Sequence, residues 1–288
     1  MTESKRAADR VAVIGTGAIG RAVVGRLLAG GRDVVVWNRT AGRTTDLVAA
    51  GARRAESVGE AASSASLVLL TLTDYTAVRQ CLAGAGTDLS GRTIIVMCTG
   101  TADDARRTAR QVAALGADYL DAGVQASPEM IGTEAATILY GGSRPAFEKH
   151  RATLDLLSTP RFTGTTPESA AIWDLALFGV WYDAQLGLLR ALDTVREAGI
   201  DVAEFSRTAA TQLGHVVAAV PASVSELLRA EYPAGPATLA EHLAVVRRLI
   251  DLRADRGLGD GGLSAVAAGI EALVADGRGD EGLTAVIG

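Results

Sequence analysis

The first half of the chain alternates short apolar runs with longer stretches in which apolar and polar residues are mixed. Strand-like runs occupy residues 11–14, 33–37, 67–71, 93–97, 118–122 and 136–140. Helix-compatible stretches include residues 21–29, 42–50, 75–82 and 101–115. Because strands separated by helices of this length form βαβ units, we predict an α/β domain with a mostly parallel sheet. Residues 154–164, with Pro160 and small polar residues, are expected to end this domain.

From Pro167 onward the pattern predicts helices throughout. The run Thr165-Thr166-Pro167-Glu168 supplies a hydroxyl cap, a proline in the first turn and an early acid, which favour a helix start. The apolar pattern continues to about Ala198, and a helix of roughly 30 residues spans about 45 Å. A helix this long and apolar on most faces must be covered, and a second subunit is the simplest cover. Shorter helices are expected over residues 202–220, 223–231, 238–256 and 263–276.

Composition narrows the functional classes. The 288 residues are 48% hydrophobic and 21% charged, which is ordinary for a globular protein and, at this length, favours two domains. The net charge of −5 argues against nucleic acid or a membrane surface as a partner. Residues 1–10 lack the apolar core of a signal peptide, and the most apolar stretch, 170–192, contains two aspartates. Cys81 and Cys98 lack metal-ligand spacing, so we expect reduced thiols, no metal and a cytoplasmic location.

Candidate chemistry begins with a glycine-rich turn after the first strand. The apolar run 11–14 breaks into Gly15-Thr16-Gly17-Ala18-Ile19-Gly20, and a helical stretch follows. In this arrangement Gly15 makes the tight turn, Gly17 lets backbone N–H groups approach phosphate, and Gly20 permits close helix–strand packing. We therefore predict that residues 15–20 hold a dinucleotide pyrophosphate. The alternative is a glycine-rich turn in another kind of α/β domain.

The end of the second strand indicates which dinucleotide is bound. An NAD site places Asp or Glu there for the ribose 2′-hydroxyl, whereas this strand ends in Asn38-Arg39-Thr40, with Arg43 shortly after. Two guanidinium groups and a hydroxyl suit a 2′-phosphate, so NADPH is the predicted cofactor. A solvated surface charge is the alternative for Arg39, and the specific role of Arg43 stays open.

Catalysis is expected where the carboxyl ends of the strands face the second domain. The predicted cofactor contacts at this edge are Leu72, Thr73, Cys98, Thr99 and Thr101. The long helix must supply the opposite wall, and on it Asp174 and Tyr182 are separated by about 80° around the axis and about 12 Å along it. In the alternative interpretation, Tyr182 is a core aromatic with a satisfied hydroxyl and Asp174 is a buried acid paired with an arginine.

Several motifs together are similar to a known family. The glycine turn with Asn38-Arg39-Thr40, then Gly100-Thr101, the segment 119–133, the run Trp173-Asp174-Leu175-Ala176-Leu177 and a closing Gly-Asp-Glu-Gly-Leu resemble the NADPH-dependent imine reductases. These enzymes and the related reductive aminases belong to the β-hydroxyacid dehydrogenase superfamily. The resemblance covers residues 10–287.

The resemblance implies a domain-swapped homodimer. Its parts would be an NADPH-binding Rossmann domain over residues 1–164, an interdomain helix over 165–198 and an all-α C-terminal domain over 199–288 that is exchanged between subunits. Each active site would combine the Rossmann domain of one chain with the helical domain of the other.

The resemblance also implies roles for site residues. Tyr182 matches the proton-donor position, Asp174 matches a position that carries an acid or amide, and His242 is either a histidine near the substrate entrance or a surface histidine. The expected substrate pocket comprises Val124, Gln125, Ser127, Met130, Trp181 and His242. Leu177 and Ile131 would add to its apolar wall.

Two departures from related patterns refine the expected reaction. Hydroxyacid dehydrogenases place a catalytic lysine near the start of the long helix, where this chain has no lysine, and many reductive aminases have an asparagine where this chain has Thr99. Ketone reduction develops negative charge on oxygen, whereas an iminium substrate is already positive and suits a carboxylate. We therefore predict NADPH-dependent reduction of hydrophobic, cyclic imines to amines, with weak reductive amination at most. The alternatives are a carbonyl or hydroxyacid reductase and a non-catalytic NADP-binding protein.

Overall fold

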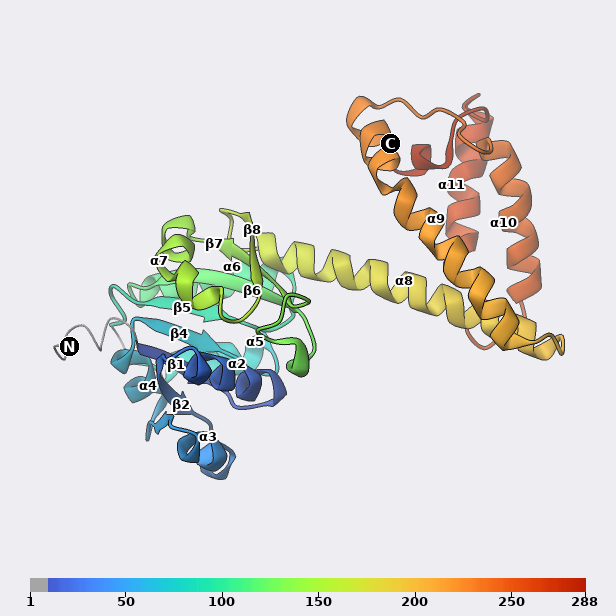
Figure 1. Ribbon diagram of the computed structural model, residues 1–288. Coiled ribbons are helices and arrows are strands. Elements are labelled where there is room, and N and C mark those ends of the chain that lie inside the picture. The colour runs from blue at the N-terminus through green and yellow to red at the C-terminus, as the bar shows by residue number, and fades with distance from the viewer. Residues whose placement is uncertain (1–9, 87) are drawn as a thin grey trace. The chain divides into compact units, whose positions relative to one another are not determined.

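The computed structural model describes residues 10–86 and 88–288, so the expectation for residues 1–9 lies outside the described residues. The chain divides into two units, Met1–Gly179 and Val180–Gly288, as the change from a sheet to helices in Figure 1 illustrates. The boundary falls within the long helix, so each unit contains part of the expected interdomain segment 165–198.

The first unit is built on an eight-stranded sheet with the order β3-β2-β1-β4-β5-β6-β7-β8. All neighbouring strands are parallel except β6 and β7, which confirms the predicted, mostly parallel α/β sheet. The strands are β1 (Arg10–Ile14), β2 (Asp33–Trp37), β3 (Arg53–Arg54), β4 (Leu67–Leu70), β5 (Thr93–Val96), β6 (Asp118–Gln125), β7 (Thr137–Gly142) and β8 (Thr159–Gly164).

Helices cover both faces of this sheet. They are α2 (Ala18–Ala29), η1 (Ala41–Thr44), α3 (Thr45–Ala49), α4 (Val58–Ser64), α5 (Tyr75–Ala83), α6 (Ala102–Ala114), η2 (Pro128–Met130) and α7 (Arg144–Leu154). Since side chains alternate along a strand, Val11 and Val13 pack in one core with α2, α3 and α7, while Ala12 and Ile14 pack in the other with α4, α5 and α6. Neither Cys81, which is buried, nor Cys98, which is half-buried, forms a disulfide, and their reduced state stays a prediction.

The second unit is helical throughout its described residues. The long helix α8 (Ser169–Glu197) begins in the first unit and continues into the second, followed by α9 (Val202–Arg229), α10 (Leu239–Arg253), α11 (Leu263–Ala275) and η3 (Leu283–Ile287). A small core joins α10, α11 and η3 through Leu239, Leu243, Ala267, Ile270 and Ala285. None of the described helices combines the length and apolar character that crossing a bilayer requires.

Residues 154–164 lie at the end of the sheet domain as expected, but they include a strand that was not predicted. Residues 159–164 form the edge strand β8, where Pro160 is tolerated since an edge strand can lack a ladder hydrogen bond. One sequence expectation was wrong. The two helices expected on either side of residue 221 are one helix, α9, with Pro221 inside it. A proline removes a single N–H donor, and the strong helix formers Ala218, Ala219 and Ala222 flank it, so the helix continues.

Candidate active site

The glycine turn joins β1 to α2 with the geometry that the sequence predicts. Gly15 has φ +98°, and a Cβ there would lie 2.4 Å from the carbonyl oxygen of Thr71. The Thr71 hydroxyl donates to the Gly15 carbonyl at 2.6 Å, and a Cβ on Gly20 would lie 2.2 Å from that same carbonyl oxygen. Gly17 caps α2 and would point a Cβ into open space. The N-terminus of α2 is thus open to an anion, while Gly15 and Gly20 close the turn behind it.

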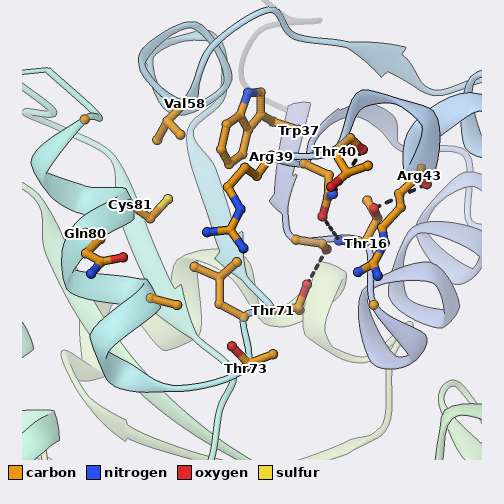
Figure 2. A pocket seen from close by; sticks show the side chains of 16 residues that line it. Thr16, Trp37, Arg39, Thr40, Arg43, Val58, Thr71, Thr73, Gln80 and Cys81 are labelled. Carbon is orange, nitrogen blue, oxygen red and sulfur yellow. Dashed lines mark hydrogen bonds between the residues drawn. The ribbon is translucent and has the colours of Figure 1, made fainter.

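A cavity of about 330 Å³ lies beside this turn (Figure 2). Nine of its lining residues were predicted as cofactor contacts: Gly15, Thr16, Gly17, Asn38, Arg39, Thr40, Arg43, Leu72 and Thr73. Sequence reasoning missed Trp37, Val58, Thr71, Ala77, Gln80, Cys81 and Gly84. The spacing 77, 80, 81, 84 follows one face of α5, which is a signal that could have found them. Of the other predicted contacts, Ala18 and Ile19 lie in the first turn of α2.

Positive charge and hydroxyl groups line one end of the cavity. Arg39 extends into it, and Arg43 and Thr40 stand on the side of β2 and η1 (Figure 2). Asn38 holds this end together, since its Oδ1 accepts from the Thr16 N–H at 3.2 Å and its Nδ2 donates to the Thr40 carbonyl at 3.1 Å. The described lining residues include neither aspartate nor glutamate, so nothing among them would repel a phosphate.

At the carboxyl ends of β5 and β6, Asp174 of α8 is buried, with 1% of its surface exposed. Its Oδ1 accepts from Gln125 Nε2 at 2.7 Å, and the Thr99 side chain also hydrogen-bonds it. Burial raises the pKa of Asp174, against the effect of these two hydrogen bonds. Its Oδ2 is buried without a hydrogen-bond partner. The partners are an amide and a hydroxyl, so the expected alternative of an arginine pair is wrong.

Gly123 is the reason that Asp174 can lie this close to the sheet. A Cβ on Gly123 would lie 2.6 Å from Asp174 Oδ1 and 2.7 Å from its Cγ. Any side chain at this position of β6 would therefore push α8 away.

A second buried carboxyl, that of Asp121, lies on β6 two residues before Gly123 and was not predicted. The hydroxyls of Tyr75 and Tyr119 donate to its Oδ1, the latter at 3.2 Å, and the backbone N–H of Ala171 also donates to it. Burial raises the pKa of Asp121 to about 7; the hydrogen bonds oppose this shift and the charge of Asp174 adds to it. An acid between the buried residues Leu120 and Ala122 was the available sequence signal.

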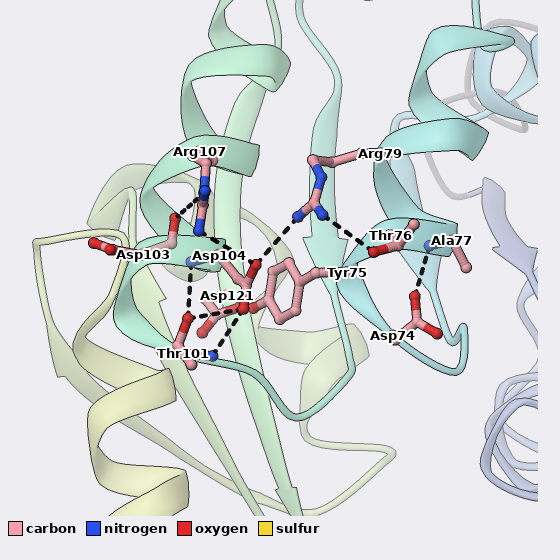
Figure 3. A network of polar contacts seen from close by, with 10 residues as sticks. All are labelled: Asp74, Tyr75, Thr76, Ala77, Arg79, Thr101, Asp103, Asp104, Arg107 and Asp121. Atoms are coloured by element: carbon pink, nitrogen blue, oxygen red, sulfur yellow. Dashed lines mark hydrogen bonds and ion pairs between the residues drawn. The ribbon is translucent and has the colours of Figure 1, made fainter.

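The loops around these carboxyls are fixed by helix caps (Figure 3). Thr101 forms a capping box with Asp104 at the start of α6, and Asp74 caps α5 by accepting from the Ala77 N–H at 2.8 Å. Arg79 joins the two helices through an ion pair with Asp104 at 3.2 Å. Cys98, Thr99 and Thr101 therefore lie at the carboxyl end of β5, but they do not line the cavity of Figure 2.

The remaining predicted substrate residues fall in both units. In the first, Val124 and Gln125 end β6, Met130 lies in η2, and Ser127 donates to Glu129 at 2.6 Å. In the second, Trp181 and Tyr182 are 57% and 54% exposed and pack edge to face with ring centroids 5.0 Å apart. Tyr182 is thus not a core aromatic of this chain. His242 is half-buried on α10.

The sheet, the glycine turn and the cavity beside it define the class of Rossmann-type dinucleotide-binding proteins. Residues 10–165 match the model of the NAD binding domain of 6-phosphogluconate dehydrogenase, and residues 166–288 match that of the NADPH-dependent reductive aminase-like C-terminal domain. The chain belongs to the family of NADPH-dependent reductive aminases and imine reductases.

Individual relatives match nearly the whole chain. An NADPH-dependent reductive aminase from Aspergillus oryzae is 29% identical over 96% of this chain and 95% of its own. The structure of a reductive aminase from Aspergillus terreus with NADPH and ethyl levulinate is 30% identical, with a TM-score of 0.88 over 97% of this chain and 98% of that one. An imine reductase from Aspergillus terreus, in complex with NADPH4 and a dibenzazepine, is 30% identical with a TM-score of 0.90 over the same shares.

Proposed function

We propose that this protein uses NADPH to reduce hydrophobic imines, in their protonated iminium form, to amines. The observation that carries the proposal is Asp174, a buried carboxyl group with one oxygen lacking a hydrogen-bond partner at the carboxyl edge of the sheet. Burying a carboxylate is costly unless a cation or a hydrogen-bond donor contacts it. A protonated iminium nitrogen supplies both a positive charge and an N–H donor.

The residues around the cavity fit NADPH. The open N-terminus of α2 at Gly17 would hold the pyrophosphate, and Arg39, Thr40 and Arg43 would hold the 2′-phosphate. Bound NADPH would supply the hydride that the carbon of the C=N bond accepts.

Asp174 would act by electrostatics. Its negative charge stabilises a positive C=N nitrogen and raises the pKa of the substrate imine, so that more of it is protonated. An ammonium at this place would repel the iminium, and residues 165–198 of the sequence contain no lysine. This charge pattern favours imine over ketone reduction and argues against the hydroxyacid alternative.

Other residues would shape the substrate site. We assign Tyr182 as the proton donor or orienting hydroxyl, and Trp181, Met130 and Val124 as apolar wall. His242 would stand near the entrance. The family relationship and the residue types support these roles.

A homodimer is part of the proposal. Large apolar side chains are exposed on the second half of α8 and on α9, among them Val180 at 69%, Val216 at 67%, Val217 at 71% and Leu228 at 81%. Burying them against a second copy would remove apolar surface from water. Light scattering of the purified protein should give twice the chain mass. A cytoplasmic location stays a prediction.

The activity test is direct. Purified protein is incubated with NADPH and a panel of cyclic imines, including 2-methyl-1-pyrroline, while the loss of cofactor absorbance is followed. Asp174→Asn, which keeps the side-chain shape and removes the charge, should lower kcat/KM by at least tenfold. Turnover of a 3-hydroxyacid without turnover of any imine would reverse the assignment, and binding of NADPH without any turnover would favour the non-catalytic alternative.

Reductive amination is the second candidate, favoured by the reductive aminases among the relatives. Thr99 replaces the asparagine that many reductive aminases have, so we expect weak formation of amine from a ketone and an amine. Cyclohexanone with a small primary amine in excess tests this, with amine product measured by gas chromatography.

A further inference from the structure

One face of β6 holds the first turns of α8 at three successive positions. Because side chains alternate along a strand, Asp121, Gly123 and Gln125 share a face. The carboxylate of Asp121 accepts from the Ala171 N–H, Gly123 leaves room for Asp174, and Gln125 donates to Asp174. The orientation of Asp174 therefore depends on this strand.

Asp121 is also tied to the loop that follows β5. Tyr75 donates to Asp121 (Figure 3). A Cβ on Gly100 would lie 2.3 Å from the Tyr75 ring, so the backbone of this loop packs directly against that ring. The neighbouring residue Thr99 hydrogen-bonds Asp174. The two carboxyls are thus held by one set of contacts from α5, the β5 loop, β6 and α8.

The hydrogen-bond partners of Asp121 do not require a charged group at this position. Its three hydrogen-bond donors, two phenols and a backbone N–H, are neutral, and an uncharged acceptor could bind them without the desolvation of a carboxylate. A second acid beside Asp174 adds like-charge repulsion. Such an arrangement is stabilised when a cation binds next to it.

We propose that Asp121 is a positioning residue for imine reduction: it fastens the first turns of α8 so that Asp174 faces the substrate, and its carboxylate adds a second negative charge behind the iminium site. This proposal rests on the proposed function. Asp121 touches neither substrate nor cofactor in this role, and it acts through Asp174.

The charge on Asp121 changes with pH in the range where enzymes are assayed. The groups that face it are Tyr75 from α5, Tyr119 from β6, Cys98 from the β5 loop and Asp174 from α8. Burial raises its pKa to about 7, so Asp121 is protonated below that pH and negative above it. The attraction for a cationic substrate should therefore increase as the pH rises through about 7.

The experiment uses a substrate whose own charge is fixed. The pH profile of kcat/KM is measured for the full-length protein with NADPH and an N-methyl dihydroisoquinolinium salt, which is cationic at every pH. In the wild type, kcat/KM should rise by about tenfold through pH 7, as expected for a unit charge acting over a partly screened distance. In Asp121→Asn this rise should be lost, and the variant should match the wild type within about twofold at low pH, where Asp121 carries no charge.

A second variant should shift the pH at which kcat/KM rises instead of abolishing the rise. Tyr119→Phe deletes a donor that favours the carboxylate, so the pKa of Asp121 increases and the rise should shift to higher pH. Tyr140→Phe is the matched control, because Tyr140 is a buried tyrosine of the same sheet whose hydroxyl has no hydrogen-bond partner. Its profile should overlay that of the wild type. Melting temperature and NADPH affinity are measured for each variant, and Tyr119→Phe carries the test if Asp121→Asn does not fold.

The outcomes separate the two proposals. Absence of iminium turnover by the wild-type protein contradicts the proposed function and this inference with it. Turnover with a rise that persists in Asp121→Asn, or that Tyr119→Phe leaves in place, contradicts the role of Asp121 alone. A uniform loss of activity at all pH values in Asp121→Asn would identify a purely structural residue.

Discussion

Replacing Arg39 with alanine tests the assignment of the cofactor. Arg39 follows β2 and lines the cavity with Thr40 and Arg43, and the described lining residues include no carboxylate. If the 2′-phosphate of NADPH binds at this end, Arg39→Ala removes one charge-assisted contact to it and leaves the contacts to the rest of the dinucleotide in place.

The size of the effect follows from the position of the side chain. A hydrogen bond to a charged group contributes about 1.5–3 kcal/mol, and the lower end applies because Arg39 is exposed to solvent. A loss of about 1.5 kcal/mol corresponds to roughly tenfold weaker binding of NADPH. The affinity for NADH, which lacks the phosphate, should change by less than about twofold, since the removed contact is absent from that complex.

Fluorescence titrations of the purified protein with NADPH and NADH measure both dissociation constants. The control is Arg110→Ala, which removes an exposed arginine on α6 and changes the net charge of −5 by the same amount. This control should leave both affinities unchanged. Equal weakening of NADPH and NADH in Arg39→Ala, or an equal loss in Arg110→Ala, would refute a specific phosphate contact.

Three further changes test other parts of the molecule. Gly123→Ala places a methyl group within 2.7 Å of Asp174, so we expect overpacking to destabilise the fold by about 1–3 kcal/mol and to lower the melting temperature. The kcat/KM for an imine should fall at least tenfold. Unchanged kinetics would contradict the proposed position of Asp174 in the site. Tyr182→Phe should lower kcat more than it raises KM if the hydroxyl transfers a proton, and an unaltered kcat would remove that role. Burial lowers the pKa of His150 to about 4, so the unfolded chain binds this proton before the folded protein does as the pH falls below 6.5. Urea unfolding should therefore show the free energy of unfolding decreasing between about pH 6.5 and 4. A His150→Gln variant should show a smaller decrease.

The cofactor half of the site was largely accessible from the sequence. Gly15, Gly17 and Gly20 lie in one turn, and Arg39 and Arg43 follow one strand, so their proximity requires only local geometry. The α5 residues of the cavity were missed for a different reason. Their helical spacing is visible in the sequence, but placing α5 beside the glycine turn requires knowing that β4 pairs with β1.

The carboxyl half depends on contacts between distant segments. Asp174 was predicted as a functional residue, but its partner Gln125 is 49 residues away in sequence, and Thr99 is farther still. The residues of the sheet that face the helix decide whether an acid on it is exposed, paired with an arginine or buried with an oxygen that lacks a hydrogen-bond partner. In this protein the facing residue is Gly123, which leaves room for Asp174 to be buried. Asp121 was not predicted because a single acid within a buried strand has no periodic pattern to identify it.

The lack of a lysine at the start of α8 and the burial of two acids beneath it form one electrostatic arrangement. A lysine there would pair with Asp121 or Asp174, neutralise the buried charge and stabilise negative charge on a substrate oxygen. Among the described residues, the hydrogen-bond donors of the two buried carboxyls are all neutral groups of tyrosine, threonine, glutamine and the backbone, and burial raises the pKa of both carboxyls. On the proposed function, these carboxyls form an incompletely compensated negative site that a cationic substrate would stabilise by binding. A neutral ketone would offer no such compensation, so the same groups that would favour the iminium would also provide selectivity against the ketone.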